Sequence, residues 1–432
     1  METPQISVGV LASESVKFSF TEKYLCRQTN KTVEGEGEVM TDGLQILYNG
    51  VPFDRLDFEP VDDNGRFELY NVRIGIGFHW ERLETQLFSG ELHFVVEDNK
   101  IRAINRLPIE DYLFCVIASE MSATSSAQLL RAHAVTSRSW LMAQLDKSKR
   151  LQGKRYKSTT LSESMLIRWY DREDHKLFDV CADDHCQRYQ GLTRASNSAV
   201  RDAIDATRGQ VITFGGEICD ARFSKCCGGV TELFETCWEP VQHPYLQSFV
   251  DDARQPDGFD TDLTKEDNAR RWIENAPSAF CNTNDATILR QVLNSYDQET
   301  ADFYRWRVEY TAEQLTDIVR RKTGIDFGLI TSLEPIERGP SGRIVKLRIT
   351  GTKCNFVIGK ELEVRRALSE SHLYSSAFTV EKNADRFILR GAGWGHGVGL
   401  CQIGAAVMSY SGYDYKMILN HYFRNAKIEK LW

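Results

Sequence analysis

The sequence predicts an α+β protein that is rich in strands and contains one long central helix. Residues 1–105 alternate short apolar runs with turn residues, which is typical of sheet strands. After a Ser/Thr-rich turn, Leu130, Ala134 and Leu141 recur at spacings of four and seven, the period of a buried helical face. Strand-like runs return near the C-terminus. Strands grouped apart from helices favour the α+β class.

The order of these patterns predicts four segments. Residues 1–105 form a strand-rich N-terminal lobe, with runs such as VKFSF and ELHFVV. Residues 106–250 form the core, including the long helix and a polar lobe at 147–195 that contains Cys and His. Residues 251–325 read as an acidic, helical insertion. Residues 326–432 again contain strands, such as GRIVKLRITG. A Gly-rich stretch and two helices follow and complete the core.

The stretch 107–144 organises the core segment. Glu120 stands before the Ser/Thr-rich turn, and Ser125 or Ser126 can cap the helix that follows. Arg138 falls on the apolar stripe of that helix, where a charge is costly unless it meets a partner. A carboxylate ahead of the helix and an inward guanidinium suggest a polar site within otherwise apolar packing.

Composition limits the classes of function. The chain has 432 residues and a net charge of -8, which argues against general nucleic-acid binding. No apolar run approaches the roughly 20 residues that a membrane helix needs. The first residues lack the features of a signal peptide, so the chain is either cytoplasmic or a mature form with an added Met. The 11 Cys are odd in number, so disulfides cannot use all of them.

The string GAGWGHGVG at 391–399 has Gly at every second position. In an extended segment, one face would be bare backbone, while Ala392, Trp394, His396 and Val398 line the other. Such a strand is entropically expensive, so we expect close approach by another backbone or by a ligand. Tight packing of the strand without any ligand is the alternative. The string fits neither dinucleotide nor Walker phosphate motifs.

Two long motifs resemble the SpoIID/LytB family, named for stage II sporulation protein D. The first is GAGWGHGVGLCQIGAAVMSYSGYDYKMILNHYF, and the second is LPIEDYLFCVIASEM followed by LLRAHAVTSRSW. The opening ISVGVL, the SGRIVKLRITG hairpin and Arg365-Arg366 also fit. The resemblance implies a two-lobed SpoIID-like architecture with an active-site helix. Cys227 in SKCCGGVTE and Leu400-Cys401 depart from the family pattern.

The resemblance implies lytic transglycosylation of peptidoglycan glycan strands, with Glu120 as the catalytic acid. A carboxyl group can protonate the glycosidic oxygen, and the carboxylate can then remove a proton from the C6 hydroxyl to close an anhydro ring. Arg138 matches a position near the family's active site. The structural alternatives are a helix-entry carboxylate favoured by the helix dipole for Glu120 and a buried ion pair for Arg138.

The string DHKLFDVCADDHCQRY offers two thiolates and two imidazoles within twelve residues, a set that suits tetrahedral zinc. These residues are His175, Cys181, His185 and Cys186, and they resemble the cluster that binds zinc in some sporulation members. Four protein ligands close the coordination shell, so we expect a structural zinc and no organic cofactor. The alternative is a disulfide or free thiols beside solvated imidazoles.

Further candidates come from the same resemblance. Ser224 and Lys225 stand where the family has its active-site strand, and Trp394 offers a flat face for a sugar, or serves as a core aromatic. His396 is either a glycan donor or a satisfied buried side chain. Gln402 either contacts the substrate or caps the following helix.

The sequence therefore predicts a lytic transglycosylase. The alternative is a non-catalytic glycan-binding module that enhances a cell-wall amidase. A zinc hydrolase is disfavoured because four ligands leave no open position. The expected partners are peptidoglycan glycan strands and a cell-wall amidase, with no nucleic acid and no transmembrane segment. The substrate predicts a location in the cell envelope, periplasmic or extracellular.

Overall fold

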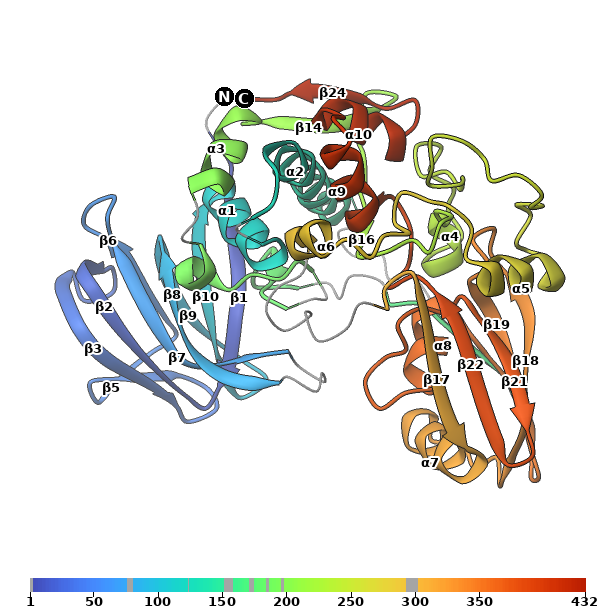
Figure 1. The fold of residues 1–432 in the computed structure, drawn as a ribbon. Helices are drawn as coiled ribbons and strands as arrows, with labels where there is room; N and C mark the ends of the chain where they lie inside the picture. The colour runs from blue at the N-terminus through green and yellow to red at the C-terminus, as the bar shows by residue number, and fades with distance from the viewer. Residues whose placement is uncertain are drawn as a thin grey trace. The chain divides into compact units, whose positions relative to one another are not determined.

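The computed structural model has the α+β composition that the sequence predicts (Figure 1). It describes residues 3–75, 81–122, 124–150, 158–170, 175–183, 186–195, 198–292 and 302–432. The chain divides into two compact units. Unit 1 comprises Met1–Ala123, Arg172–Gly209 and Lys430–Trp432, and unit 2 comprises Thr124–Asp171 and Gln210–Glu429. In the described residues, no helix is long and apolar enough to cross a membrane.

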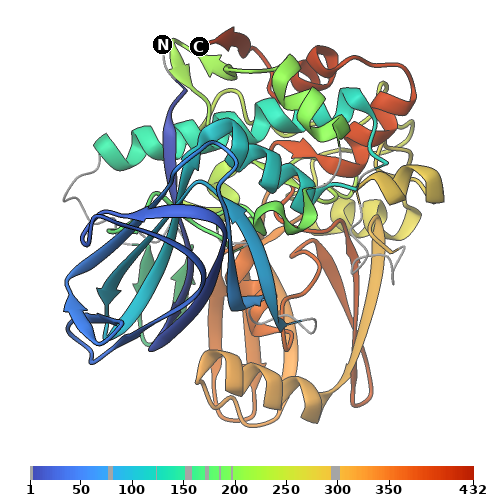
Figure 2. The ribbon, with the colours of Figure 1, turned by 90° about the vertical axis from the view of Figure 1, so that its left-hand side faces the viewer.

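Unit 1 is built on an 11-stranded sheet in the order β13-β1-β10-β9-β6-β2-β3-β4-β5, with β7 pairing with β2 and β8. The sheet is strongly curled (Figure 2). Its strands are β1 (Gln5–Ser13), β2 (Ser15–Cys26), β3 (Lys31–Thr41), β4 (Ile46–Tyr48), β5 (Val51–Phe53), β6 (Arg55–Pro60), β7 (Arg66–Ile74), β8 (Arg82–Ser89), β9 (Glu91–Glu97), β10 (Lys100–Pro108) and β13 (Val180–Cys181). The strand-rich reading of residues 1–105 is confirmed.

Aromatic side chains fill the inner face of this sheet. Phe18 and Phe20 are two residues apart on β2, so both point inward. The Phe18 ring lies 5.6 Å from that of Phe58 and 5.4 Å from that of Phe94. Tilted rings at these spacings add to the stabilisation from apolar burial.

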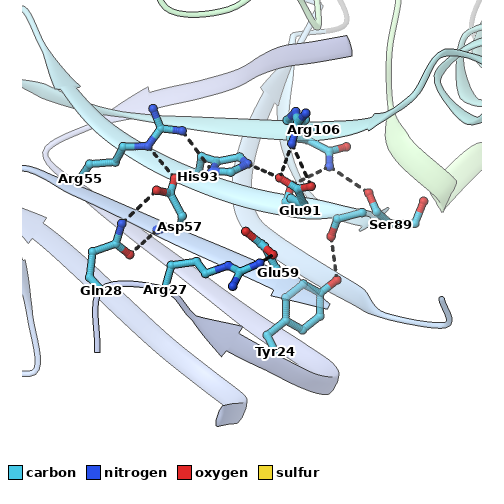
Figure 3. A network of polar contacts seen from close by, with 12 residues as sticks. Tyr24, Arg27, Gln28, Arg55, Asp57, Glu59, Ser89, Glu91, His93 and Arg106 are labelled. Atoms are coloured by element: carbon cyan, nitrogen blue, oxygen red, sulfur yellow. Dashed lines mark hydrogen bonds and ion pairs between the residues drawn. The ribbon is translucent and has the colours of Figure 1, made fainter. Parts of the chain in front are cut away.

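A polar network runs across β6 and β9 (Figure 3). His93 is buried between Asp57, to which its Nδ1 hydrogen-bonds, and Glu91, whose Oε2 lies 2.9 Å from Nε2. Arg55 binds Asp57 with its Nε at 2.6 Å, and Arg106 binds Glu91 at 3.1 Å. Burial raises the pKa of Asp57, but hydrogen bonds, first from His93 and then from Arg55, outweigh it and hold that pKa well below its usual range.

The helices of unit 1 are α1 (Ile109–Glu120), the short 3₁₀ helix η1 (Gly191–Arg194) and α3 (Ser198–Ala206). The mostly apolar residues that precede Glu120 thus form a helix. Nine of its twelve residues are buried, so it shows no polar face and no helical period in the sequence. Buried Glu110 accepts hydrogen bonds from the Gly209 backbone and from the Trp432 indole, each at 3.1 Å, which ties the C-terminus to α1.

Unit 2 surrounds the long helix α2 (Ala127–Arg150), which packs against α9 (Gln402–Tyr410), α10 (Tyr415–Tyr422) and β14 (Gln210–Phe214). Helix α6 (Ala286–Val292) packs on α9. Strands β15 (Glu217–Ile218), β14 and β24 (Lys427–Lys430) form one small sheet, and β16 (Phe223–Ser224) pairs in parallel with β23 (Leu400–Cys401). The two C-terminal helices predicted from the sequence are confirmed.

The rest of unit 2 contains two further sheets. Strands β11 (Thr159–Leu161), β12 (Met165–Arg168), β20 (Asn355–Gly359), β19 (Ile344–Gly351) and β18 (Ile330–Arg338) form the first. Strands β17 (Arg305–Thr311), β22 (Arg386–Ala392) and β21 (Phe378–Asn383) form the second. The remaining helices are α4 (Phe234–Cys237), α5 (Glu266–Asn275), α7 (Ala312–Thr323) and α8 (Glu361–Ala367). The predicted hairpin around 340–342 is confirmed, because β18 and β19 pair across it.

Candidate functional site

Glu120 is the last residue of α1 and is half-buried. The helix-entry reading is wrong for this residue, because α2 begins only at Ala127, seven positions later. At the C-terminal end of a helix, the unpaired carbonyl groups and the macrodipole disfavour a negative charge. A carboxylate at this end of α1 gains nothing from the helix dipole, which is a second reason why the helix-entry reading fails.

Tyr112 lies on the same helix and is fully buried. Its hydroxyl donates to Gln187 Oε1 at 3.3 Å. Burial raises the pKa of Tyr112 well above its usual range, and the negative charges of Cys186, Cys181 and Glu120 raise it further. Tyr112 is therefore within electrostatic range of both the candidate acid and the Cys/His segment.

Helix α2 begins as the sequence predicts. The Ser126 hydroxyl accepts a hydrogen bond from the Leu129 amide at 3.3 Å, while Ser125 donates to the Gln291 carbonyl at 2.5 Å. Ser126 is therefore the capping residue. Arg138 is fully buried, as its place on the apolar stripe predicts, and its Nη1 donates to the backbone carbonyl of Gln210 at 3.1 Å.

His133 and Gln402 form a buried pair that joins α2 to α9. Gln402 Nε2 lies 3.1 Å from His133 Nε2, and Ser137 Oγ lies 3.2 Å from His133 Nδ1. Burial lowers the pKa of His133 to about 3, and the nearby Lys225 charge contributes. The capping alternative for Gln402 is wrong, because Cys401 is the N-cap of α9. Sequence reasoning left His133 unassigned, since its partner is far away in the chain.

The Gly-rich segment differs from the regular strand that the sequence suggests. Gly393, Gly395, Gly397 and Gly399 all have φ between 73° and 89°, a left-handed conformation that side chains rarely adopt. Strand β22 ends at Ala392, before these glycines. The segment therefore alternates left-handed glycines with larger residues instead of continuing as a pleated strand.

The expectation of close backbone approach in this segment is confirmed. A Cβ at Gly393 would lie 2.7 Å from the Cys226 carbonyl oxygen, and one at Gly397 would lie 2.5 Å from the Arg343 guanidinium. The guanidinium donates to the Gly395 carbonyl at 3.0 Å and to the Cys227 carbonyl at 3.1 Å. Glycine thus makes room for a buried arginine that holds the loop.

Glu232 and Ser341 support this arginine, and sequence reasoning missed both. Glu232 is fully buried, and its Oε2 accepts from the Ser341 hydroxyl at 2.5 Å. That hydroxyl in turn accepts from Arg343 Nη1 at 2.8 Å. Burial raises the pKa of Glu232, although Ser341 and Arg343 oppose the shift. Nothing in the sequence around Glu232 marks it, because its partners come from other segments.

Trp394 is half-buried and lies in an aromatic group. Its ring centroid is 4.7 Å from that of Phe303 and 4.6 Å from that of Tyr374. His396 accepts a hydrogen bond from the Val398 amide on Nδ1 at 3.0 Å, and its ring meets the Trp238 edge at 4.8 Å. Burial, followed by the charges of neighbouring arginines, lowers the pKa of His396 well below its usual range, so its imidazole is neutral.

Ser224 and Lys225 lie at the end of β16. The Ser224 hydroxyl is buried and has no hydrogen-bond partner among the described residues. Lys225 Nζ donates to the Val292 carbonyl at 2.6 Å. After them, Gly228 and Gly229 form a turn with φ of 82° and 103°. Unit 2 therefore brings together Ser224, Lys225, Trp394, His396 and Gln402 on β16 and the segment that leads into α9.

The Cys/His segment lies in unit 1 beside β1. The ligand atoms of His175, Cys181 and Cys186 all lie within 4.8 Å of one another, with 3.5 Å between Cys186 Sγ and His175 Nε2. Cys181 is on β13, which pairs with β1, and the Asp179 carboxylate accepts from the Ser7 amide at 2.9 Å. Three described ligands of this kind fit a zinc ion. The fourth predicted ligand, His185, lies outside the described residues.

Comparisons with known proteins identify similar sequences. Residues 97–214 match a family model described as stage II sporulation protein, and residues 232–399 match a domain of unknown function, DUF8618. The chain is 25% identical to an uncharacterised protein of Brachyspira hyodysenteriae over 416 residues, which cover 96% of this chain and 87% of that protein.

Two relatives from Bacillus subtilis carry functional names. Stage II sporulation protein D is 21% identical over 329 residues, 76% of each chain. An amidase enhancer is 23% identical over 238 residues, 52% of this chain and 32% of that protein. Taken with the two long sequence motifs, these matches support the assignment of the chain to the SpoIID/LytB family.

Proposed function

We propose that this protein is a peptidoglycan lytic transglycosylase of the cell envelope in which Glu120 acts first as the acid and then as the base. The observation that carries the proposal is the position of Glu120. It is a half-buried carboxylate at the C-terminal end of α1, within the LPIEDYLFCVIASEM motif that resembles the SpoIID/LytB family. Similarity to stage II sporulation protein D and to an amidase enhancer supports a role at the cell wall.

In the proposed reaction, the Glu120 carboxyl group gives its proton to the glycosidic oxygen as the bond from that oxygen to C1 breaks. Positive charge develops at C1 of the muramic sugar. The carboxylate then takes the proton of the C6 hydroxyl, and the C6 oxygen bonds to C1. The products are a 1,6-anhydro end and a free hydroxyl on the departing sugar. The acid is regenerated, and no water is consumed.

We assign the glycan-holding role to residues of unit 2. The Trp394 ring, flanked by Phe303 and Tyr374, offers an apolar face against which a sugar ring can pack. The buried Ser224 hydroxyl makes no hydrogen bond to any of the described residues, so it can bind a glycan hydroxyl. We assign positioning roles to four residues that already hydrogen-bond other groups of the protein, namely Arg138, Lys225, His396 and Gln402.

A zinc ion at His175, Cys181 and Cys186, with His185 as the fourth ligand, would brace the segment that follows β13. Its coordination shell would be closed, so it would supply structural stability only. Through Gln187 and Tyr112 this segment contacts α1, the helix that carries the proposed acid.

The test is incubation with purified, peptide-free glycan strands followed by mass spectrometry. We expect anhydro-ended fragments from the wild type and none from Glu120→Gln. Asp111→Asn, which removes a half-buried carboxylate paired with Arg201 in the first turn of the same helix, should retain activity. Cys181→Ser/Cys186→Ser should lose the zinc bound at this segment but still yield anhydro ends at temperatures where it is folded.

The second candidate is a glycan-binding module that enhances an amidase, which the similarity to the amidase enhancer favours. Intact strands that bind both the wild type and Glu120→Gln would support this candidate and overturn the first. Fragments with reducing ends that disappear with a chelator would instead indicate zinc-dependent hydrolysis.

A further inference from the structure

Unit 2 contains a second group of metal-binding side chains, far from the Cys/His segment in the sequence. The ligand atoms of Cys227, Asp251, Cys281 and Cys401 all lie within 4.8 Å of one another. All four residues are buried, with at most 2% of their surface exposed. They come from four separate segments, so only the fold brings them together. We refer to these four residues as the Cys3Asp cluster.

The spacing within the cluster fits tetrahedral coordination better than a disulfide. Cys227 Sγ lies 3.5 Å from Cys281 Sγ and 3.2 Å from Asp251 Oδ2. Two sulfurs bound to one zinc at about 2.3 Å would be roughly 3.8 Å apart in a tetrahedral site. A disulfide would require about 2.05 Å. Small shifts of these side chains would therefore complete a coordination shell.

The surroundings of Asp251 orient its carboxylate toward the thiols. Oδ1 is held by His421 Nε2 at 3.0 Å, which leaves Oδ2 directed at Cys227. Carboxylates that bind a metal are usually held in place by hydrogen bonds of this kind. Asp251 is also completely buried, and a carboxylate in that position is costly without a cation or full hydrogen bonding.

The sulfur of Cys401 accepts two backbone hydrogen bonds. Cys401 is the N-cap of α9, a helix of nine residues, and its sulfur accepts from the Gly404 amide at 3.4 Å. The Cys227 amide also donates to this sulfur at 3.3 Å. N–H donors to sulfur are typical around metal-bound cysteines.

From this geometry we propose that Cys227, Cys281, Cys401 and Asp251 bind one zinc ion in unit 2. Soft thiolates select zinc over magnesium or calcium, and four protein ligands make the site structural. Each bound thiol would release one proton to solvent. The ion would join the Gly-rich segment before α9 to the segment around 251–281. This inference is independent of the proposed enzymatic activity.

The first experiment measures zinc by mass spectrometry in full-length protein that already contains Cys181→Ser/Cys186→Ser. This background removes the Cys/His site, so we expect about one zinc per chain to remain. Adding Cys281→Ser should remove it. Adding Cys354→Ser, at a half-buried cysteine outside the cluster, should leave it in place. Absence of zinc from the background protein would overturn the proposal.

The second experiment does not require a substitution of any cysteine in the Cys3Asp cluster. Cobalt is exchanged into the same background protein, and its absorption spectrum is recorded. We expect intense visible bands of a tetrahedral ion and a sulfur-to-cobalt charge-transfer band. Asp251→Asn, which preserves the side-chain shape, should shift the visible bands and weaken binding. Iron with acid-labile sulfide, or a Cys227–Cys281 disulfide in the isolated protein, would contradict the zinc assignment.

Discussion

Gln402 Nε2 lies 3.1 Å from His133 Nε2, inside the packed boundary between α9 and α2. The amide can donate to an imidazole nitrogen only while that nitrogen carries no proton. The contact thus favours neutral His133, in agreement with a pKa lowered to about 3 by burial. The helix that follows the Gly-rich segment is therefore tied to the long helix by a bond that acid should break.

This pair makes the stability of unit 2 dependent on pH. The pKa of His133 is about 3 in the folded protein and about 6.5 in the unfolded chain. Between these two pH values, the folded protein therefore binds fewer protons than the unfolded chain. The stabilisation is present above about pH 6.5 and is lost as pH falls toward 3. Relative to His133→Gln, the wild type should lose up to about 1.4 kcal/mol per pH unit. Urea unfolding from pH 7 to pH 4 measures the difference, and parallel profiles would contradict the prediction.

A second pH dependence is expected in unit 1, at Asp57. Hydrogen bonds hold its folded pKa below the unfolded value, so its contribution is present above about pH 4 and lost as pH falls through the folded pKa. At pH 7, Asp57→Asn should destabilise β6 and β9 by about 1–3 kcal/mol. Hydrogen exchange of peptides from these strands measures the effect. The exposed Asp54, on the turn before β6, provides the control as Asp54→Asn. Equal rates of hydrogen exchange in the two variants would contradict the prediction.

The Gly-rich segment should be intolerant of alanine where the space is occupied. Gly397→Ala places a Cβ 2.5 Å from the Arg343 guanidinium, at a φ of 74°. Gly412→Ala has a similar backbone problem, with a φ of 91°, but meets nothing within 4 Å. Gly397→Ala should therefore cost about 1–3 kcal/mol more than Gly412→Ala. Thermal unfolding of both variants provides the comparison, and equal losses would show that only backbone strain matters.

Glycan binding should depend on the flat face of Trp394. Trp394→Ala removes the ring between Phe303 and Tyr374, while Trp394→Phe keeps an aromatic side chain. We expect the alanine variant to bind peptide-free glycan strands about 1 kcal/mol more weakly, roughly fivefold, with the phenylalanine variant in between. Isothermal titration calorimetry on the Glu120→Gln background avoids turnover. Unchanged affinity in Trp394→Ala would assign this ring to the core alone.

The sequence by itself determined the features that depend on local spacing. Alternation of apolar residues predicted the strands of residues 1–105, because a strand exposes one face to the core at every second position. Apolar spacing and a serine cap predicted the start of α2 and the burial of Arg138. The short spacing of His175, Cys181 and Cys186 along the chain predicted that their ligand atoms lie close together, since that spacing already limits their separation in space.

Only the tertiary structure decided the rest. Helix α1 escaped prediction because it is buried on nearly all sides and so has no amphipathic period. The left-handed glycines of the 391–399 segment depend on the backbones and the arginine packed against them. Cys227 and Cys401 are separated by 174 positions, and His133 and Gln402 by 269. No pattern of neighbouring residues encodes such pairs, because they form when segments distant in the chain pack together to bury their apolar surfaces.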